Sequence, residues 1–132
     1  MIDHVNAIAL TVRDVKMCAE FYRDKVGMKV HQMNDEEAYL SFGQKGAPIL
    51  AIIGASGLAR ELPAERIRPN ELPLQRNYLA VFLEDADKEY ETLRQRGVKF
   101  LQPPASRPNG QRYAFFEDPE GNLWEISHFP KA

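Results

Sequence analysis

The sequence contains few of the residues on which several large classes of protein depend. It has one cysteine among 132 residues, so no disulfide can form within the chain, and a reducing compartment is expected. Its 17 lysines and arginines are balanced by 19 aspartates and glutamates, which gives a formal net charge of −2. Because the basic residues form no stripe, a nucleic-acid partner is not expected.

Long hydrophobic runs are also absent. The longest apolar run, Ile49 to Ile53, is far shorter than the roughly 20 residues that cross a bilayer. The chain does not begin with a charged segment followed by an apolar one, so a secretory signal is not expected. With 44% hydrophobic and 27% charged residues, the composition is typical of a globular domain. We therefore expect one cytoplasmic domain with no membrane partner.

What the sequence does contain is an internal repeat. Residues 7–14 (AIALTVRD) match residues 78–85 (YLAVFLED) at an offset of 85 − 14 = 71, which becomes 97 − 27 = 70 at the next glycines. At an offset of 74, residues 39–42 match 113–116, and Ala51 matches Glu125. An internal repeat largely decides the architecture, so each copy is expected to form a module of the same fold.

Each copy is predicted to contain a strand, a helix and three more strands. Period-two alternation indicates first strands at about 7–12 and 78–83. Asp14 and Asp85 stand where helix N-caps belong, and Gly27 and Gly97 stand where the helices should end. The later strands are expected at 28–32, 37–42 and 48–53 in the first copy, and at 99–102, 112–116 and 122–128 in the second.

The predicted fold class is therefore α+β, with two βαβββ modules that form an incomplete barrel around a cavity. The modules cover about residues 1–53 and 78–132 of a single domain. Residues 54–77 connect them and contain four arginines: Arg60, Arg66, Arg68 and Arg76. A connection this long is either a tether or a lid over a pocket, and the sequence leaves both possibilities open.

One helix covers only one face of each sheet, so the two faces should differ. Period-two alternation places a larger set of side chains under the helices: Ile8, Leu10, Val12, Leu79, Val81, Leu83, Trp124 and Ile126. The opposite face should line the cavity with a second set: Ala7, Ala9, Thr11, Ile49, Ala51, Ile53, Tyr78, Ala80, Phe82, Leu123 and Glu125. The small residues of this second set leave room for a bound molecule.

Two stretches carry a family resemblance. One is Thr11-Val12-Arg13-Asp14 with the later Phe21-Tyr22-Arg23-Asp24 and Gly27, and the other is the segment 117–122 (EDPEGN) before the last strand. With these motifs the chain resembles the vicinal oxygen chelate superfamily, which includes glyoxalase I, fosfomycin-resistance transferases, extradiol dioxygenases and bleomycin-resistance proteins. The resemblance extends from about Met1 to Phe129 and implies the fold, whereas one fold supports many chemistries.

The resemblance also implies a divalent metal held by His or Glu at four strand positions. In this sequence those positions are Ala7, Tyr78, Ala51 and Glu125. Alanine has no ligand atom, and a neutral phenol is a poor ligand at pH 7, so Glu125 alone is a ligand of the family type. We therefore expect no metal and no other cofactor, with a divalent metal held by other residues as the alternative.

The three histidines do not restore the set. His4 lies three residues before Ala7, and His128 lies three residues after Glu125. Odd spacing along a strand directs a side chain to the opposite face of the sheet. His31 belongs to a different predicted strand.

Glu125 has three interpretations. If Phe82, Leu123 and Tyr113 desolvate it, its neutral form would be favoured. The first interpretation is structural: Glu125 bonds Tyr78 or a nearby arginine. The second is functional: Glu125 anchors a cationic or hydrogen-bonding ligand, or acts as a general base with Tyr78 as proton donor. Residual metal binding is the remaining interpretation.

The leading functional hypothesis is a small-molecule-binding protein of the bleomycin-resistance type that is metal-free and sequesters its ligand. The alternatives are a divalent-metal-dependent lyase, transferase or dioxygenase, and a metal-free enzyme with Glu125 as base. If it is an enzyme, Glu125 and Tyr78 are the predicted catalytic residues. The predicted ligand-binding residues are Ala9, Thr11, Tyr39, Ile53, Phe82, Tyr113, Phe115 and Leu123. The resemblance further implies a homodimer, which the apolar face of each module supports.

Overall fold

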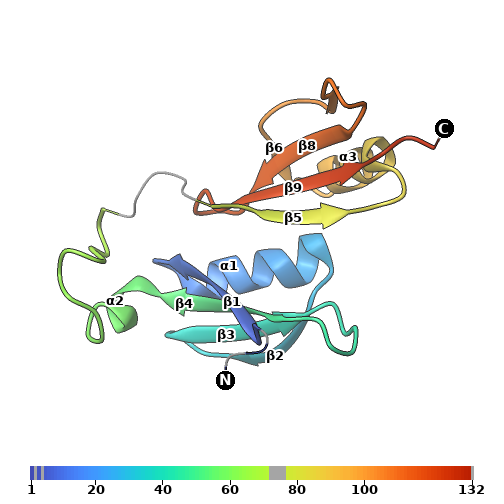
Figure 1. Ribbon diagram of the computed structural model, residues 1–132. Coiled ribbons are helices and arrows are strands. Elements are labelled where there is room, and N and C mark those ends of the chain that lie inside the picture. Colours follow the sequence, from blue (N-terminus) through green and yellow to red (C-terminus); the bar gives the residue numbers. More distant parts are fainter. Residues whose placement is uncertain (2, 4, 72–76, 132) are drawn as a thin grey trace. The chain divides into compact units, whose positions relative to one another are not determined.

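The computed structural model describes residues 1, 3, 5–71 and 77–131, which belong to two compact units, Met1–Leu74 and Gln75–Ala132. Each unit is one β-sheet with a helix against one of its faces (Figure 1). The α+β class and the two βαβββ modules are confirmed. Their closure into an incomplete barrel around a cavity, within a single domain, stays a prediction.

The N-terminal unit begins with a strand, a helix and a short π-helical continuation of that helix. Its elements are β1 (Ala7–Val12), α1 (Val15–Phe21), η1 (Tyr22–Val26), β2 (Lys29–Met33), β3 (Glu37–Ser41), β4 (Ile49–Gly54) and α2 (Ala55–Leu58). The strands lie in the order β1-β4-β3-β2. Only β1 and β4 run parallel, as expected when a helix connects the first strand to the rest of the sheet.

The C-terminal unit repeats this topology. Its elements are β5 (Leu79–Phe82), α3 (Ala86–Gln95), β6 (Lys99–Phe100), β7 (Ala105–Ser106), β8 (Arg112–Glu117) and β9 (Leu123–His128). The order is β5-β9-β8-β6, β5 and β9 are parallel, and β7 also pairs with β8. The sequence did not predict β7, because it has two residues and lies in a stretch with three prolines.

The predicted helix caps are confirmed. Asp14 Oδ1 accepts a hydrogen bond from the Met17 N–H at 3.0 Å, and Asp85 Oδ1 accepts one from the Lys88 N–H at 3.0 Å. Gly27 ends the first helical segment with φ +93°, a left-handed conformation that glycine adopts without steric cost.

Removal of the Asp85 cap should destabilise the C-terminal unit. We expect Asp85→Ala to lower the free energy of unfolding by about 1 kcal/mol, because the Lys88 N–H loses its acceptor. Asp85→Asn should lower the free energy of unfolding by less, because an amide oxygen can still cap the helix. Glu84→Ala, at the exposed neighbouring residue, is the control. Urea unfolding followed by circular dichroism measures all three variants. Equal losses for Asp85→Ala and Glu84→Ala would contradict the capping role.

The larger apolar set packs beneath the helices only in part. Leu10, Val12, Trp124 and Ile126 are buried as predicted, and Trp124 stacks on Phe116 at 5.9 Å between ring centroids. Ile8, however, is 38% exposed, and the apolar residues of and next to β5 (Leu79, Val81 and Leu83) are only partly buried. β1 and β5 are edge strands of their own sheets, so the helix covers them less completely than the central strands.

The strand register tests the repeat directly. Ala9 pairs with Ala51, and Ala80, 71 residues after Ala9, pairs with Glu125, so Ala51 and Glu125 are equivalent positions as predicted. The matching of the third strands at an offset of 74 was wrong. Because Tyr39 opposes Ala51 and Phe115 opposes Glu125, that offset is 115 − 39 = 76. The loop 42–48 is two residues longer than the loop 118–122. Because side chains alternate with period two, a difference of two residues leaves the matched side chains on the same face of the sheet.

The part of the connection that the structure describes, residues 54–71, is mostly exposed and contains α2 next to β4. Two of its arginines form surface ion pairs, Arg60 with Glu36 and Arg68 with Glu71. Arg76 lies outside the described residues, and so does His4. None of the described helices is long and apolar enough to cross a membrane.

Candidate ligand-binding site

Glu125 occupies the centre of the C-terminal sheet. It lies on β9, with Ala80 of β5 opposite on one side and Phe115 of β8 on the other. Its neighbours Trp124 and Ile126 are core residues of the helix-covered face, so Glu125 belongs to the opposite, open face. Within this unit α3 packs on the other face of the sheet, yet Glu125 is only 2% exposed. A carboxylate buried to this degree requires a compensating partner.

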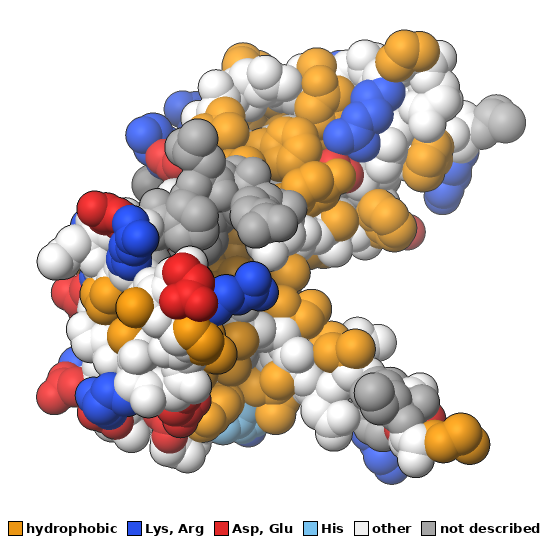
Figure 2. All heavy atoms as spheres, turned by 60° about the vertical axis from the view of Figure 1, so that its left-hand side comes forward, with side chains coloured by type: hydrophobic (Ala, Val, Ile, Leu, Met, Phe, Trp, Pro, Cys, Tyr) orange, Lys and Arg blue, Asp and Glu red, His pale blue; other side chains and the backbone are white. Residues whose placement is uncertain are grey.

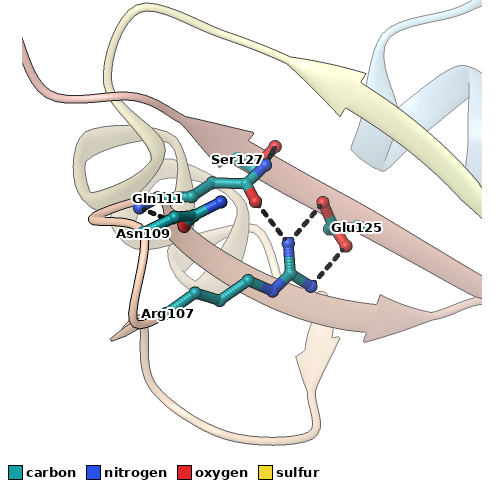
Figure 3. Close-up of polar contacts among 5 residues, drawn as sticks. All are labelled: Arg107, Asn109, Gln111, Glu125 and Ser127. Carbon is teal, nitrogen blue, oxygen red and sulfur yellow. Dashed lines mark hydrogen bonds and ion pairs between the residues drawn. The ribbon is translucent and has the colours of Figure 1, made fainter.

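That partner is Arg107. Its Nη2 donates to Glu125 Oε2 at 2.8 Å, and its Nη1 donates to Oε1 at the longer distance of 3.4 Å (Figure 3). Nη1 also donates to Gln111 Oε1 at 2.7 Å, and Gln111 Nε2 donates to Ser127 Oγ at 3.2 Å. Among the described residues, no buried side-chain nitrogen or oxygen lacks a hydrogen-bond partner. The network therefore satisfies the buried charge within this unit.

A tight turn between β7 and β8 positions Arg107. The Arg107 N–H donates to the Gln111 carbonyl, and the Gly110 N–H donates to the Arg107 carbonyl, both at 2.9 Å. Gly110 has φ +89°, which explains a glycine at this point of the turn. Asn109 Oδ1 accepts from the Gln111 N–H at 3.0 Å. The turn thus directs Arg107 back over the sheet.

The guanidinium is held on a second side by an aromatic ring. Its central carbon lies 4.1 Å from the ring centroid of Tyr113, a cation–π geometry. The hydrogen bond to Glu125 is the largest cause that raises the pKa of Arg107 above its ordinary value. Arg107 therefore stays charged and keeps a single orientation across the open face.

Of the three interpretations of Glu125, the first is confirmed in its arginine form. Glu125 bonds a nearby arginine, and no hydrogen bond joins it to Tyr78 in the described part of the chain. The sequence reasoning considered only the apolar neighbours of Glu125 and omitted Arg107. The sequence signal that could have found it is the Arg107-Pro108-Asn109-Gly110 turn directly before a predicted strand.

Aromatic side chains extend from Arg107 across the same face. Tyr113 contacts Phe115 edge to face at 5.9 Å, and Phe115 contacts Tyr78 in the same manner at 5.3 Å. Tyr78 is 51% exposed and Phe82 is 76% exposed, whereas Leu123 is partly buried. Figure 2 shows hydrophobic side chains gathered on the surface of this unit beside a few charged ones. We call Tyr78, Phe82, Tyr113 and Phe115 the aromatic face.

The other four predicted ligand-binding residues lie on the N-terminal unit. Ala9 is exposed, and Thr11, Tyr39 and Ile53 are partly buried. Tyr39 and Ile53 line a hollow of about 370 Å³ with residues of β3, β4 and the α2 segment. The Tyr39 hydroxyl donates to Glu37 Oε2 at 2.8 Å, and this hydrogen bond is the main reason why the pKa of Tyr39 is raised.

The residues at the family's metal positions do not fit a metal. Ala7, Ala51 and Tyr78 offer no suitable ligand, and both oxygens of Glu125 accept hydrogen bonds from Arg107. The described histidines also have other partners. His31 Nε2 lies 2.7 Å from Ser41 Oγ, and His128 Nδ1 accepts from the Ala86 N–H at 2.7 Å.

One other group, formed by Asp85, Asp87 and His128, brings three potential ligand atoms within 4.8 Å of one another. Each of the three already has a role at the start of α3: Asp85 caps the helix, His128 accepts from its backbone, and Asp87 binds Arg112. The hydrogen bond from Arg112 is the largest cause that lowers the pKa of Asp87. This arrangement anchors the helix, and nothing in it points to a bound ion.

The comparisons with known proteins agree with the fold. The family model of the glyoxalase/bleomycin resistance protein/dioxygenase superfamily matches residues 2–126. The chain is 34% identical to the Bacillus subtilis protein YraH over 90% of this chain and 93% of that protein.

Among solved structures, the chain is similar to a glyoxalase/bleomycin resistance protein/dioxygenase from Nocardioides, with a TM-score of 0.77 and 27% identity over 100% of this chain and 87% of that one. Lactoylglutathione lyase from Agrobacterium tumefaciens, with a TM-score of 0.72 and 17% identity over 96% of this chain and 94% of that one, shares the fold.

Proposed function

Because the chain belongs to the glyoxalase/bleomycin resistance protein/dioxygenase superfamily, we propose that it is a metal-free member that binds and sequesters a small molecule. The observation that carries the proposal is the Arg107–Glu125 pair. Glu125 is the one family-type metal ligand left in the sequence, and an arginine of the same chain occupies its carboxylate. The positively charged guanidinium of Arg107 thus lies where a metal ion bound to Glu125 would otherwise lie.

The open face of the C-terminal sheet supports the binding of an organic molecule. Its exposed aromatic rings provide a large apolar surface that is costly to leave in water. Ligand sites typically combine such a surface with a few fixed polar groups, and the Arg107 network is of this kind. Binding by shape and stacking requires no Lewis acid.

The same network argues for sequestration over catalysis by Glu125. A general base must reach a substrate proton within hydrogen-bond distance. Glu125 is 2% exposed, and both of its oxygens face Arg107. Tyr78, the proposed proton donor, lies against Phe115. We therefore assign Glu125 the role of holding Arg107.

We further propose that the protein acts in the cytoplasm as a homodimer. A single cysteine suits a reducing compartment, and large apolar residues remain exposed in both units: Ile8, Ile49, Tyr78 and Phe82 are among them. A small molecule is its proposed partner, and neither nucleic acid nor a membrane is.

A thermal-shift panel of planar aromatic compounds in EDTA tests the function. We expect several compounds to raise the melting temperature, because a ligand that binds the native state stabilises it by mass action. The compounds should be recovered chemically unchanged after incubation. Binding or turnover that appears only after Zn²⁺, Ni²⁺ or Mn²⁺ is added would contradict the proposal and favour the metal-dependent lyase, transferase or dioxygenase.

A matched pair of variants locates the surface that binds. Phe82→Ser should weaken binding of the compounds that the panel identifies by about tenfold, because Phe82 belongs to the aromatic face. Phe129→Ser removes a similarly exposed ring just beyond β9 and should leave the affinity unchanged. Titration calorimetry measures both dissociation constants. Equal effects of the two variants would show that binding occurs elsewhere.

A further inference from the structure

One donor edge of Arg107 has no partner within the part of the chain that the structure describes. A guanidinium has five N–H groups in a plane, and two of its edges each present a pair of them to a carboxylate. Glu125 takes the edge formed by Nη1 and Nη2, and Gln111 takes the remaining Nη1 hydrogen. The second edge, formed by Nε–H and the outer Nη2–H, meets no acceptor among the described residues.

Two other arginines of the chain show what this edge normally does. Arg112 donates from Nε and Nη2 to the two oxygens of Asp87, at 3.2 and 2.5 Å. Arg23 donates from the same two nitrogens to Asp24, at 2.6 and 3.0 Å. In both cases one carboxylate accepts a hydrogen bond on each of its two oxygens from this edge. The Nε and Nη2 donors of Arg107 can make the same contact with the carboxylate of a ligand.

The surroundings of Arg107 favour such a ligand. Its side chain is 31% exposed, although Glu125, Gln111 and Tyr113 hold it in place. A group already fixed in its binding conformation loses little conformational entropy when a ligand arrives. Tyr113 lies against the face of the guanidinium and contacts Phe115, which contacts the exposed Tyr78, so aromatic surface begins at Arg107 itself.

The charge of the site also discriminates between ligand classes. A cationic ligand would have to displace Arg107 from a carboxylate that is 2% exposed, and this would leave the guanidinium without its partner. An anionic ligand needs no displacement, because it uses donors that are still available. The site therefore favours an anion without disturbing the Arg107–Glu125 pair.

We propose that the unused edge of Arg107 binds the carboxylate of a planar aromatic acid whose ring packs against the aromatic face. The proposal rests on the proposed function and specifies the class of ligand. Glu125 orients the arginine, and the arginine contacts the ligand.

Three compounds with one ring system test the proposal on the full chain: 2-naphthoate, 2-naphthamide and 2-naphthylmethylammonium. We expect titration calorimetry to show that the acid binds about ten- to a hundredfold more tightly than the amide, because hydrogen bonds between charged groups are the stronger ones. The ammonium compound should bind no better than the amide.

Paired variants separate recognition from folding. Arg107→Met with Glu125→Gln removes both charges together, so no lone charge stays buried. This double variant should bind the acid only as well as the amide, while its affinity for the amide stays within about twofold of the parent. The matched control is Arg112→Met with Asp87→Asn, which removes a pair whose donor edge is already occupied. The control should keep the full preference for the acid.

Each outcome has a defined meaning. Equal binding of acid and amide by the parent protein, or a preference for the ammonium compound, overturns the inference about Arg107 and leaves metal-free ligand binding intact. An equal loss of acid preference in both double variants also overturns it. If none of the three compounds binds and the wider aromatic panel is also negative, the proposed function itself fails.

Discussion

Arg107→Met is expected to lower the free energy of unfolding by about 3 kcal/mol, which is among the largest effects of any single substitution in this chain. Removal of one member of a buried ion pair leaves the other charge in a poorly solvated place, and this typically costs about 3–5 kcal/mol. Glu125 is 2% exposed, and Arg107 is the residue with which it forms an ion pair. Because Arg107 itself is 31% exposed, we place the effect at the lower end of that range.

The single tryptophan makes the measurement specific to the C-terminal unit. Trp124 is next to Glu125 in β9 and is 4% exposed, so its fluorescence during urea unfolding follows this sheet. Glu125→Gln in the Arg107→Met background should restore at least half of the loss. Arg60→Met removes an exposed ion pair with Glu36 and should change the free energy by less than about 0.5 kcal/mol. An Arg107→Met effect as small as that of Arg60→Met would contradict the role of the pair.

Asp118→Ala is also expected to lower the free energy of unfolding by about 3 kcal/mol. Asp118 is 2% exposed, and its Oδ1 accepts from the N–H groups of Glu120 and Asn122, both at 2.9 Å. Its Oδ2 accepts from Asn122 Nδ2 at 2.8 Å. A buried donor left without an acceptor costs about 1–3 kcal/mol, and here three partly buried donors lose theirs together. The variant should also bind aromatic ligands more weakly, since this turn sets the start of β9 and therefore the position of Glu125.

Asp118→Asn provides the control, because an amide oxygen can still accept from the two backbone N–H groups. It should lose less than half as much stability as Asp118→Ala when both are measured by Trp124 fluorescence. If the two variants are equally destabilised, the charge of Asp118 and not its turn geometry is what matters.

Most of the fold could be predicted because its signals are local and occur twice. Period-two alternation, an N-capping aspartate and a helix-ending glycine appear in the same order in both copies, so each supports the assignment of the other. The offset between the third strands was wrong because it depends on loop length, and loops carry no periodic pattern. The partial exposure of Ile8 was missed because edge position is a property of the assembled sheet.

The candidate site could be predicted only by half. The repeat identified Glu125 as a carboxylate equivalent to Ala51, and the register confirms that position. Arg107 was missed because its direction depends on a turn and not on strand alternation. The connection has four arginines, but two of them, Arg60 and Arg68, form exposed ion pairs with Glu36 and Glu71. A single arginine in a Pro-Asn-Gly turn is the one that reaches the buried carboxylate.

The central claim is that Arg107 provides the positive charge beside Glu125, so that the site binds its ligand without a metal. Elemental analysis of protein purified without added metal, combined with titration of 2-naphthoate before and after dialysis against EDTA, tests this claim most directly. We predict less than about 0.1 equivalent of any transition metal per chain and an unchanged affinity after dialysis, because the family's ligand positions offer too few donors. Close to one tightly bound metal per chain, with ligand affinity lost on its removal, would contradict the claim.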